Sequence, residues 1–324
     1  MHVDRFITME VAPVRLETTV GILVAYDPAT DPRTALKHLA EVLAFVIIVD
    51  NAAGGHPLLP AEGALPGNVR LLRHGNRGGL AGAYNVALDL IFVSMPGARH
   101  VVFVDEDSDV DALSAFIEHE GTLDATSDKS VAAVAPAHRD RLSGLRASHV
   151  ILKRFSFKRL PRDVQGVVQV AFVINSLSLW SLGALRHIGP FDEALGIDQV
   201  DIDYCLRARQ CGYKVYLNGD CEFAHSIGRR RLYFLLGRQF QTGGHSAARR
   251  YLIGRNTIWL AKRYLTVYPA MAVICLFRIV HEGLGIAVAE ADKFAKLKQL
   301  AKGVLVGSMT SSRPVMQQSM GREP

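Results

Sequence analysis

The chain has 324 residues, of which 49% are hydrophobic and 21% charged, and this composition excludes a disordered chain. Its formal net charge of +6 favours anionic partners such as nucleotide phosphates or acidic lipid headgroups. The basic, aromatic-bearing signature of a nucleic-acid-binding module is missing, so we expect no nucleic-acid partner.

The cysteines and the apolar segments bear on cellular location. The four cysteines form neither a CxxC pair nor a zinc-ligand pattern, which is typical of reduced thiols in a cytoplasmic protein. The N-terminus lacks the cationic and apolar regions of a signal peptide, so none is expected. Residues 269–289 are strongly apolar but contain Arg278, His281 and Glu282, so we do not expect them to span a membrane.

Strand-like and helix-like segments alternate through the first third of the chain. Residues 18–26 are apolar and β-like, and residues 31–43 form an amphipathic helical pattern. The alternation continues with strands over 45–49, 69–73 and 101–104 and a helix over 79–93. This rhythm predicts the α/β class, with a doubly wound, mainly parallel sheet.

The second part of the chain is less regular. We expect a helix over 112–123, strands over 131–135, 167–179 and 215–217, and a helix over 201–210. Residues 139–165 are polar and rich in arginine, without a clear period. From residue 249 onward the pattern is helical and increasingly basic or apolar.

A cluster of acids follows the apolar strand at 101–104. Acids at the carboxyl end of such a strand lie where open α/β sheets place their ligands. Asp105 and Asp107 have the spacing to share one Mg²⁺ with the phosphates of a nucleotide. Short acid pairs also cap helices or form turns, which is the alternative interpretation.

Two earlier segments have the composition of a nucleotide site. Asp50 and Asn51 end the second predicted strand, where an acid either accepts hydrogen bonds from a base or ribose or forms a turn. The glycine-rich stretch 74–85 leads into a helix, and its helix start and Arg77 favour a phosphate. A tight strand-to-helix connection would explain the glycines but not the two asparagines, Asn76 and Asn85.

Further acids and a histidine occur late in the chain. Asp198, Asp201 and Asp203 lie at a helix start, and three acids exceed what capping requires, so we expect at least one to be a general base. An ion pair of Asp203 with Arg207 is the structural alternative. His225 follows the strand at 215–217 and is suited either to a structural role or to metal or phosphate contact.

This ordered set of motifs resembles the inverting glycosyltransferases of family 2, and within them the bacterial rhamnosyltransferases of surface-polysaccharide assembly. The matching segments are Asp50-Asn51, Asn76 to Asn85, Asp105 to Ser108, Ile188 to Glu193, Asp198 to Arg207 and Tyr251 to Asn256. The likeness spans roughly residues 18–310. It implies a GT-A fold with an N-terminal arm over 1–17, a catalytic domain over 18–265 and a C-terminal amphipathic helical region over 266–324.

The resemblance also implies roles for individual residues. The predicted nucleotide-sugar site consists of Asp50, Asn51, Asn76, Arg77, Gly79, Asn85 and Asp105. Asp105 and Asp107 would bind Mg²⁺ or Mn²⁺ on the diphosphate, with His225 as a further ligand. Asp201 would be the general base, and Asp198 and Asp203 would position the acceptor or tune that base.

The implied function is metal-dependent, inverting sugar transfer onto a glycan or lipid-linked acceptor in cell-surface polysaccharide synthesis, with dTDP-L-rhamnose as the leading donor. A UDP-sugar-dependent galactofuranosyltransferase stays open, because the Gly78-Gly79 doublet is closer to such members. A non-catalytic glycan-binding scaffold on the same fold is the other alternative, although the intact Asp105, Asp107 and Asp201 argue against it.

The C-terminal region fits amphipathic helices with basic residues among apolar ones. The basic residues are Arg278, Lys293, Lys296, Lys298 and Lys302. Such helices either lie on an anionic membrane, here the inner face of the plasma membrane, or pack on the catalytic domain or a second subunit of a homo-oligomer.

Overall fold

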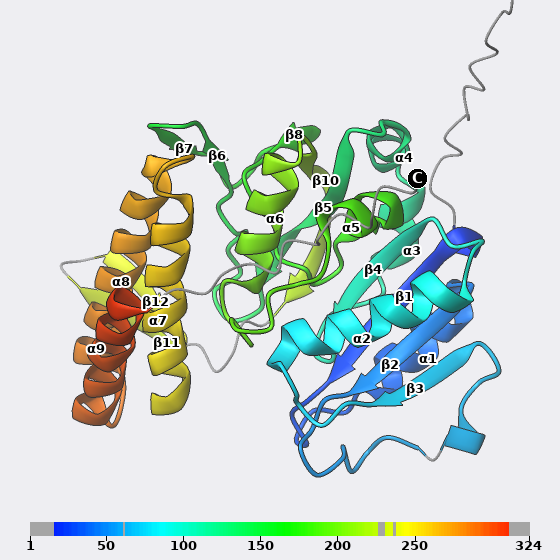
Figure 1. The fold of residues 1–324 in the computed structure, drawn as a ribbon, viewed down its shortest axis with the longest axis horizontal. Helices are drawn as coiled ribbons and strands as arrows, with labels where there is room; N and C mark the ends of the chain where they lie inside the picture. The colour runs from blue at the N-terminus through cyan, green and yellow to red at the C-terminus, as the bar shows by residue number, and fades with distance from the viewer. Residues whose placement is uncertain (1–15, 61, 226–230, 236–237, 311–324) are drawn as a thin grey trace, which may run out of the picture.

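The computed structural model describes residues 16–60, 62–225, 231–235 and 238–310 (Figure 1). The predicted N-terminal arm, residues 1–17, lies almost wholly outside this range. Short 3₁₀ turns occur at Leu16–Thr18 and Glu62–Ala64.

An eight-stranded sheet forms the centre of the described part, in the order β3-β2-β1-β4-β9-β5-β10-β8. Its strands are β1 (Thr19–Ala25), β2 (Phe45–Asp50), β3 (Val69–Arg73), β4 (His100–Asp105), β5 (Val131–Asp140), β8 (Val167–Gln169), β9 (Leu179–Ser181) and β10 (Lys214–His225). β1 to β4 pair in parallel, as do β5 and β10, whereas β9 and the edge strand β8 are antiparallel to their neighbours. The predicted α/β fold class with a mainly parallel sheet is confirmed.

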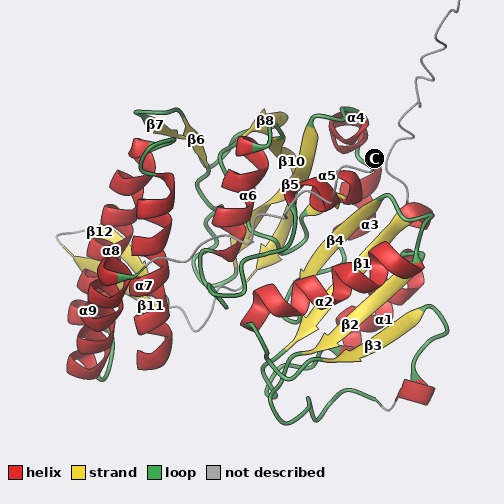
Figure 2. Cartoon of the chain, viewed as in Figure 1, coloured by secondary structure: helices red, strands yellow, loops and turns green. Residues whose placement is uncertain are grey.

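Helices cover both faces of the sheet (Figure 2). They are α1 (Arg33–Val42), α2 (Gly79–Ser94), α3 (Leu113–Glu118), α4 (Glu120–Ser127), α5 (Leu182–Ile188) and α6 (Val200–Gln210). Side chains alternate along a strand, so Ile22 and Val24 pack in the core with α2, α5 and α6. Leu23 and Ala25 pack in the opposite core with α1 and α3. Burial on both faces explains why β1 is apolar at every position except Thr19 and Gly21.

Three long helices form an extension beside the sheet: α7 (Ala247–Tyr264), α8 (Pro269–Ala289) and α9 (Lys293–Met309) (Figure 1). α7 and α9 approach closely because Gly303 faces the Tyr251 carbonyl, where a side chain would collide. α7 thus belongs to the predicted catalytic domain but packs on the predicted C-terminal region, and the boundary at 265 stays a prediction.

Several segments differ from the sequence prediction. The helix expected over 112–123 is two helices, because His119 is extended and its ring accepts a hydrogen bond from the Gly121 N–H. The strand expected over 167–179 forms only at its two ends, β8 and β9, and the residues between them form a loop. Two hairpins had no counterpart in the prediction: β6 (Val150–Leu152) with β7 (Phe157–Arg159), and β11 (Arg231–Leu235) with β12 (Arg238–Thr242).

Candidate active site

A cleft of about 450 Å³ opens at the carboxyl ends of β1 and β2. Its lining residues are Tyr26, Asp27, Pro28, Ala52, Ala53, Gly54, Gly55 and Asn76. Parallel strands of an α/β sheet present their ligand sites at this edge. We therefore expect a nucleotide to bind in this cleft. Asn76, which the sequence places in the nucleotide-sugar site, is one of the residues that line it.

Asp50 holds one of the loops that line this cleft. Its carboxylate is buried and accepts hydrogen bonds from the His56 N–H at 3.0 Å and from Arg73 Nη1 at 3.1 Å. These bonds hold the loop over residues 52–56 that lines the cleft. The predicted contact of Asp50 with a base or ribose stays a prediction.

Two groups whose roles the sequence does not reveal support the cleft, Glu106 and His56. Glu106 accepts hydrogen bonds from the N–H groups of Tyr26 and Asp27, at 2.8 and 2.7 Å. The buried His56 ring lies 3.0 Å from the Asp27 carbonyl and 3.8 Å from Glu106. The Glu106 contacts join residues 80 and 79 positions apart, and the contact of His56 with the Asp27 carbonyl joins residues 29 apart, so no local pattern could have revealed them.

The glycine-rich turn is held by Asn51. Its Nδ2 donates to Asn76 Oδ1 and to the Gly79 carbonyl, both at 3.3 Å. The Leu80 N–H at the start of α2 donates at 2.7 Å to the carbonyl of Gly196, so this helix start is already engaged by protein. Arg77 is exposed beside the turn, and its phosphate contact stays a prediction, as does the role of Gly79.

Gly79 should be sensitive to substitution, and its turn contains a matched control. Gly79 has φ +65°, and an added Cβ would lie 2.5 Å from the Gly196 carbonyl oxygen. Gly75 has φ +68° with nothing within 4 Å of an added Cβ. We expect Gly75→Ala to cost about 1 kcal/mol of unfolding free energy and Gly79→Ala about 3 kcal/mol in urea melts. Equal costs would contradict the close approach to Gly196.

Asn85 holds a distant part of the chain. Its amide accepts from the Phe191 N–H at 2.8 Å and donates to the Phe191 carbonyl at 3.0 Å and to Glu193 at 2.9 Å. Both polar atoms of Asn85 are thus used in joining α2 to residues 191–193. Its predicted contact with the donor sugar stays a prediction.

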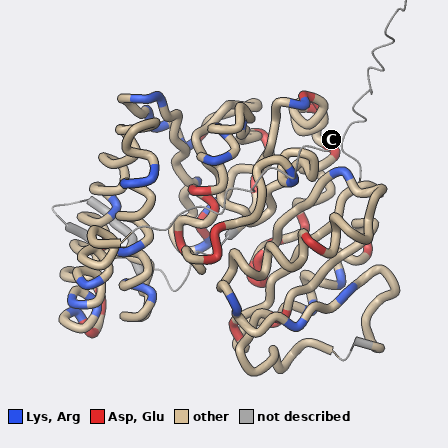
Figure 3. The backbone as a smooth tube through the Cα atoms, viewed as in Figure 1, with Lys and Arg blue, Asp and Glu red and all other residues tan. Residues whose placement is uncertain are grey.

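Asp105 is the last residue of β4 and lies near several other carboxylates. Burial raises the pKa of Asp105 to about 8, and nearby carboxylates add to the rise. Those carboxylates are Asp107, Asp201 and Glu106. Figure 3 shows further acidic positions at and just before the start of α6.

Asp201 lies in the first turn of α6, close enough to Asp105 to raise its pKa. Burial raises the pKa of Asp201 itself to about 6, and the neighbouring Asp198 adds to the rise. A carboxylate poised near neutral pH is suited to accept a proton from a hydroxyl. The acids predicted after β4 and at the start of α6 are therefore close enough to influence one another electrostatically.

Asp198, unlike Asp201, is held in an ion pair. Its carboxylate accepts hydrogen bonds from Arg249 Nε at 3.0 Å and Nη2 at 3.3 Å, and Arg278 Nη2 lies 3.8 Å away. Burial by itself raises the pKa of Asp198, but Arg249 outweighs it and the net pKa is lowered. Asp198 therefore stays ionised and raises the pKa of Asp201, and its role in catalysis stays a prediction.

Asp203 is turned toward α7. It is 1% exposed, forms an ion pair with Arg263 and accepts a hydrogen bond from the Tyr264 hydroxyl at 2.9 Å. The anticipated pair with Arg207 is present but long, at 3.9 Å. The structure uses Asp203 to join α6 to α7, and its role toward the acceptor stays a prediction.

The Tyr251 to Asn256 motif supports the loop before α6. Asn256 is fully buried, and its Nδ2 donates to the carbonyls of Leu195 at 2.8 Å, Ile197 at 2.7 Å and Asp198 at 3.1 Å. Asp198 and Gln199 both have left-handed φ, at 60° and 68°. We infer that Asn256 stabilises this strained entry to α6, which sets the position of Asp201.

The residues at the end of β4 fit a divalent cation. Mg²⁺ uses one or two protein carboxylates and completes its shell with substrate oxygens and water. Asp105 and Asp107 are such a pair in sequence, and the pKa of Asp105 is raised first by burial and then by neighbouring carboxylates, whose negative charge a cation would neutralise. Within the described residues, no three ligand-type side chains gather closely enough to hold a metal by themselves. The backbone of His225 pairs with Asp140, but its side chain lies outside the described part.

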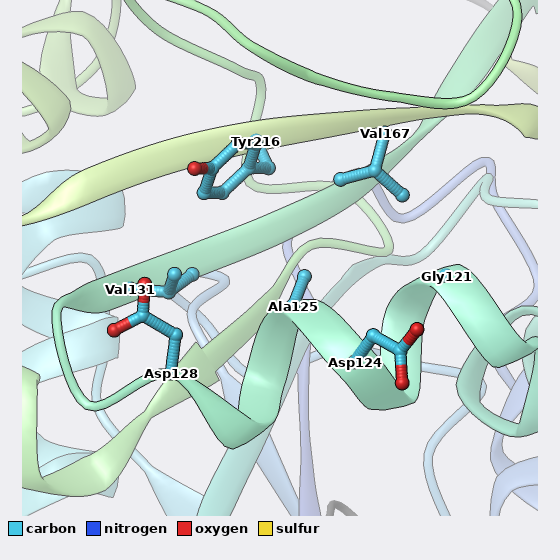
Figure 4. Close-up of a pocket in the computed structure, with 7 residues that line it drawn as sticks. All are labelled: Gly121, Asp124, Ala125, Asp128, Val131, Val167 and Tyr216. Atoms are coloured by element: carbon cyan, nitrogen blue, oxygen red, sulfur yellow. The ribbon is translucent and has the colours of Figure 1, made fainter.

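A second hollow, of about 330 Å³, lies between α4 and the strands β5, β8 and β10 (Figure 4). Val131 and Tyr216 line it near the amino ends of β5 and β10, at the edge of the sheet opposite Asp105. Asp128 is bound there by Lys214 at 3.1 Å. This hollow is therefore separate from the acids of the candidate site.

The chain is similar in sequence to a known protein. No family model matches the chain. The chain is similar to the dTDP-rhamnosyl transferase RfbF of Shigella flexneri, at 26% identity over 298 residues, which cover 89% of this chain and 94% of that protein. This similarity confirms the resemblance predicted from the motifs.

Solved structures with a similar fold include S. aureus TarS 1-349, with a TM-score of 0.49 and 13% identity, covering 89% of this chain and 81% of that one. GalNAc-T7 with UDP, GalNAc and Mn²⁺ has a TM-score of 0.46 and 14% identity, covering 82% of this chain. The chain spans about half the length of that GalNAc-T7 chain, 54%.

Proposed function

We propose that this chain, a glycosyltransferase with the GT-A fold, transfers L-rhamnose from dTDP-L-rhamnose to a hydroxyl of a glycan or lipid-linked acceptor, with inversion at the anomeric carbon. The observation that carries the proposal is that Asp201 is close enough to Asp105 to raise its pKa, and that Asp105 ends β4 at the same edge of the sheet as the cleft. The similarity to a dTDP-rhamnosyl transferase over 89% of the chain supports the choice of donor.

In the proposed reaction, the Asp201 carboxylate accepts the proton of the acceptor hydroxyl. The hydroxyl oxygen then forms a bond to the anomeric carbon as the bond from that carbon to the diphosphate oxygen breaks. Attack from the face opposite the leaving group inverts the configuration. Asp198 keeps its negative charge beside Asp201 and so makes it a stronger base.

Asp105 and Asp107 would hold Mg²⁺ or Mn²⁺ beside the donor diphosphate. The cation would supply Lewis-acid stabilisation of the charge on the departing nucleoside diphosphate. Asp50, Asn51 and Asn76 would hold the nucleotide in the cleft, at the cytoplasmic side of the membrane where nucleotide sugars are available.

Calorimetric titration with nucleotide sugars tests the donor. We expect dTDP-L-rhamnose to bind in the presence of Mn²⁺, with binding weakened by EDTA, and UDP-galactofuranose and UDP-glucose to bind more weakly. Preference for UDP-galactofuranose would keep the fold and acids but overturn the donor. Binding of none of the three would contradict the proposed donor and favour the glycan-binding scaffold.

A further inference from the structure

The outer side of α8 carries a continuous row of exposed apolar side chains. Its members are Val273, Leu276, Phe277, Val280, Leu284 and Val288. Each is between 40% and 62% exposed, and spacings of three or four residues place them on one side of the helix. We call this set the α8 row. Contiguous apolar surface of this kind marks an interaction site.

The inner side of α8 holds the helix on the protein. Arg278 faces Asp198 at 3.8 Å, and Glu282 forms an ion pair with the buried Arg250. Met271 and Cys275 are buried in a small core on the same side. Among the described helices, α8 is the one long and apolar enough to cross a membrane, but these ionic contacts bind its middle turns to the rest of the protein. The α8 row therefore faces outward from an anchored helix.

α9 adds positive charge beside α8. Residues 293–309 contain four lysines and no acidic residue. Lys293, Lys298 and Lys302 are exposed, and the same helix exposes Phe294 at 82% between the first two lysines and Leu305 at 60% after the third. Figure 3 shows basic positions spread along this helical extension.

We propose that the α8 row and the lysines of α9 dock onto an anionic lipid bilayer, with α8 lying in the plane of the membrane surface. Apolar side chains interspersed with lysines are typical of helices that lie in the interface of anionic membranes. Interfaces between protein subunits are instead depleted in lysine, which disfavours a second copy as the occupant. The proposal does not depend on the donor, since it concerns a surface away from the nucleotide cleft.

Co-flotation of the purified full-length protein with vesicles tests the proposal. We expect the protein to float with vesicles of equal parts phosphatidylcholine and phosphatidylglycerol, and less with phosphatidylcholine alone or at high salt. Leu276→Asp/Phe277→Asp should lower the bound fraction by about tenfold or more, because two apolar side chains no longer enter the bilayer. The matched control is Val93→Asp/Phe155→Asp, which changes side chains that are 84% and 74% exposed elsewhere on the surface.

A second pair of variants tests the lysines of α9. Lys298→Glu/Lys302→Glu should remove the preference for anionic vesicles, whereas Lys153→Glu/Lys158→Glu, at exposed positions of the β6–β7 hairpin, should keep it. Flotation unchanged by the Leu276/Phe277 pair would overturn the proposal. A dimer in solution that this pair converts to a monomer would assign the row to a second copy instead. Binding that resists carbonate extraction would mean that α8 crosses the bilayer.

Discussion

Asp201→Asn is expected to lower kcat by about 10²–10⁴-fold while donor binding stays near that of the wild type. The amide keeps the size and most of the polarity of the carboxylate but cannot take a proton from the acceptor. Single-turnover transfer and calorimetric donor titration on the same preparation would separate the two effects.

The pH dependence has a defined sign. Burial raises the pKa of Asp201 to about 6, and the base must be ionised to act, so wild-type transfer should rise with pH through about 6 and level above it. The residual rate of Asp201→Asn should not show this step. For stability the sign reverses: a carboxyl whose folded-state pKa is raised stabilises the fold below its unfolded-state pKa, and this contribution is lost as pH rises through about 6.

At neutral pH Asp201→Asn should therefore be at least as stable as the wild type, with a gain in unfolding free energy of up to about 3 kcal/mol, the equivalent of a pKa raised from 3.8 to about 6. Loss of transfer together with unchanged or higher stability distinguishes a missing base from a misfolded protein. Asp124→Asn, on α4 in the second hollow, is the matched control and should alter neither property. A near-wild-type rate for Asp201→Asn would exclude Asp201 as the base.

The parallel half of the fold could be predicted from sequence because its elements are local. Each apolar run is ended by a turn signal, so the predicted strand over 45–49 and helix over 79–93 match β2 and α2 to within a residue. The prediction of one strand over 167–179 was wrong because the apolar composition continues through the loop between β8 and β9. There Leu177 has φ +55° and is buried, which periodicity does not reveal.

The positions of the acids could be predicted, but not their partners. Asp198, Asp201 and Asp203 look alike in sequence, and three-dimensional contacts separate them. Asp198 pairs with Arg249 and Asp203 with Arg263, whereas the pKa of Asp201 is raised. Each arginine follows its partner by 50 residues or more, so the distinction depends on how α7 packs against α6.

Asp107→Ala is expected to weaken metal-dependent donor binding by at least about tenfold, because even groups that only support metal ligands contribute this much. Asp107 is exposed at the end of β4, two residues from Asp105, so its removal should leave the core intact. Titration of dTDP-L-rhamnose with Mn²⁺ and with EDTA measures the effect. For the wild type the two conditions should differ strongly, and for Asp107→Ala they should converge.

Asp109→Ala is the matched control, since it removes another carboxylate from the same loop. Asp109 lies 3.9 Å from Arg141, and its loss should leave the difference between Mn²⁺ and EDTA as in the wild type. If Asp107→Ala kept the full response to Mn²⁺, Asp107 would be excluded from the metal site. If both variants lost the response, its cause would be the negative charge of the loop rather than coordination by Asp107. Each variant removes one negative charge from the loop, so an effect of charge alone should be the same at either position.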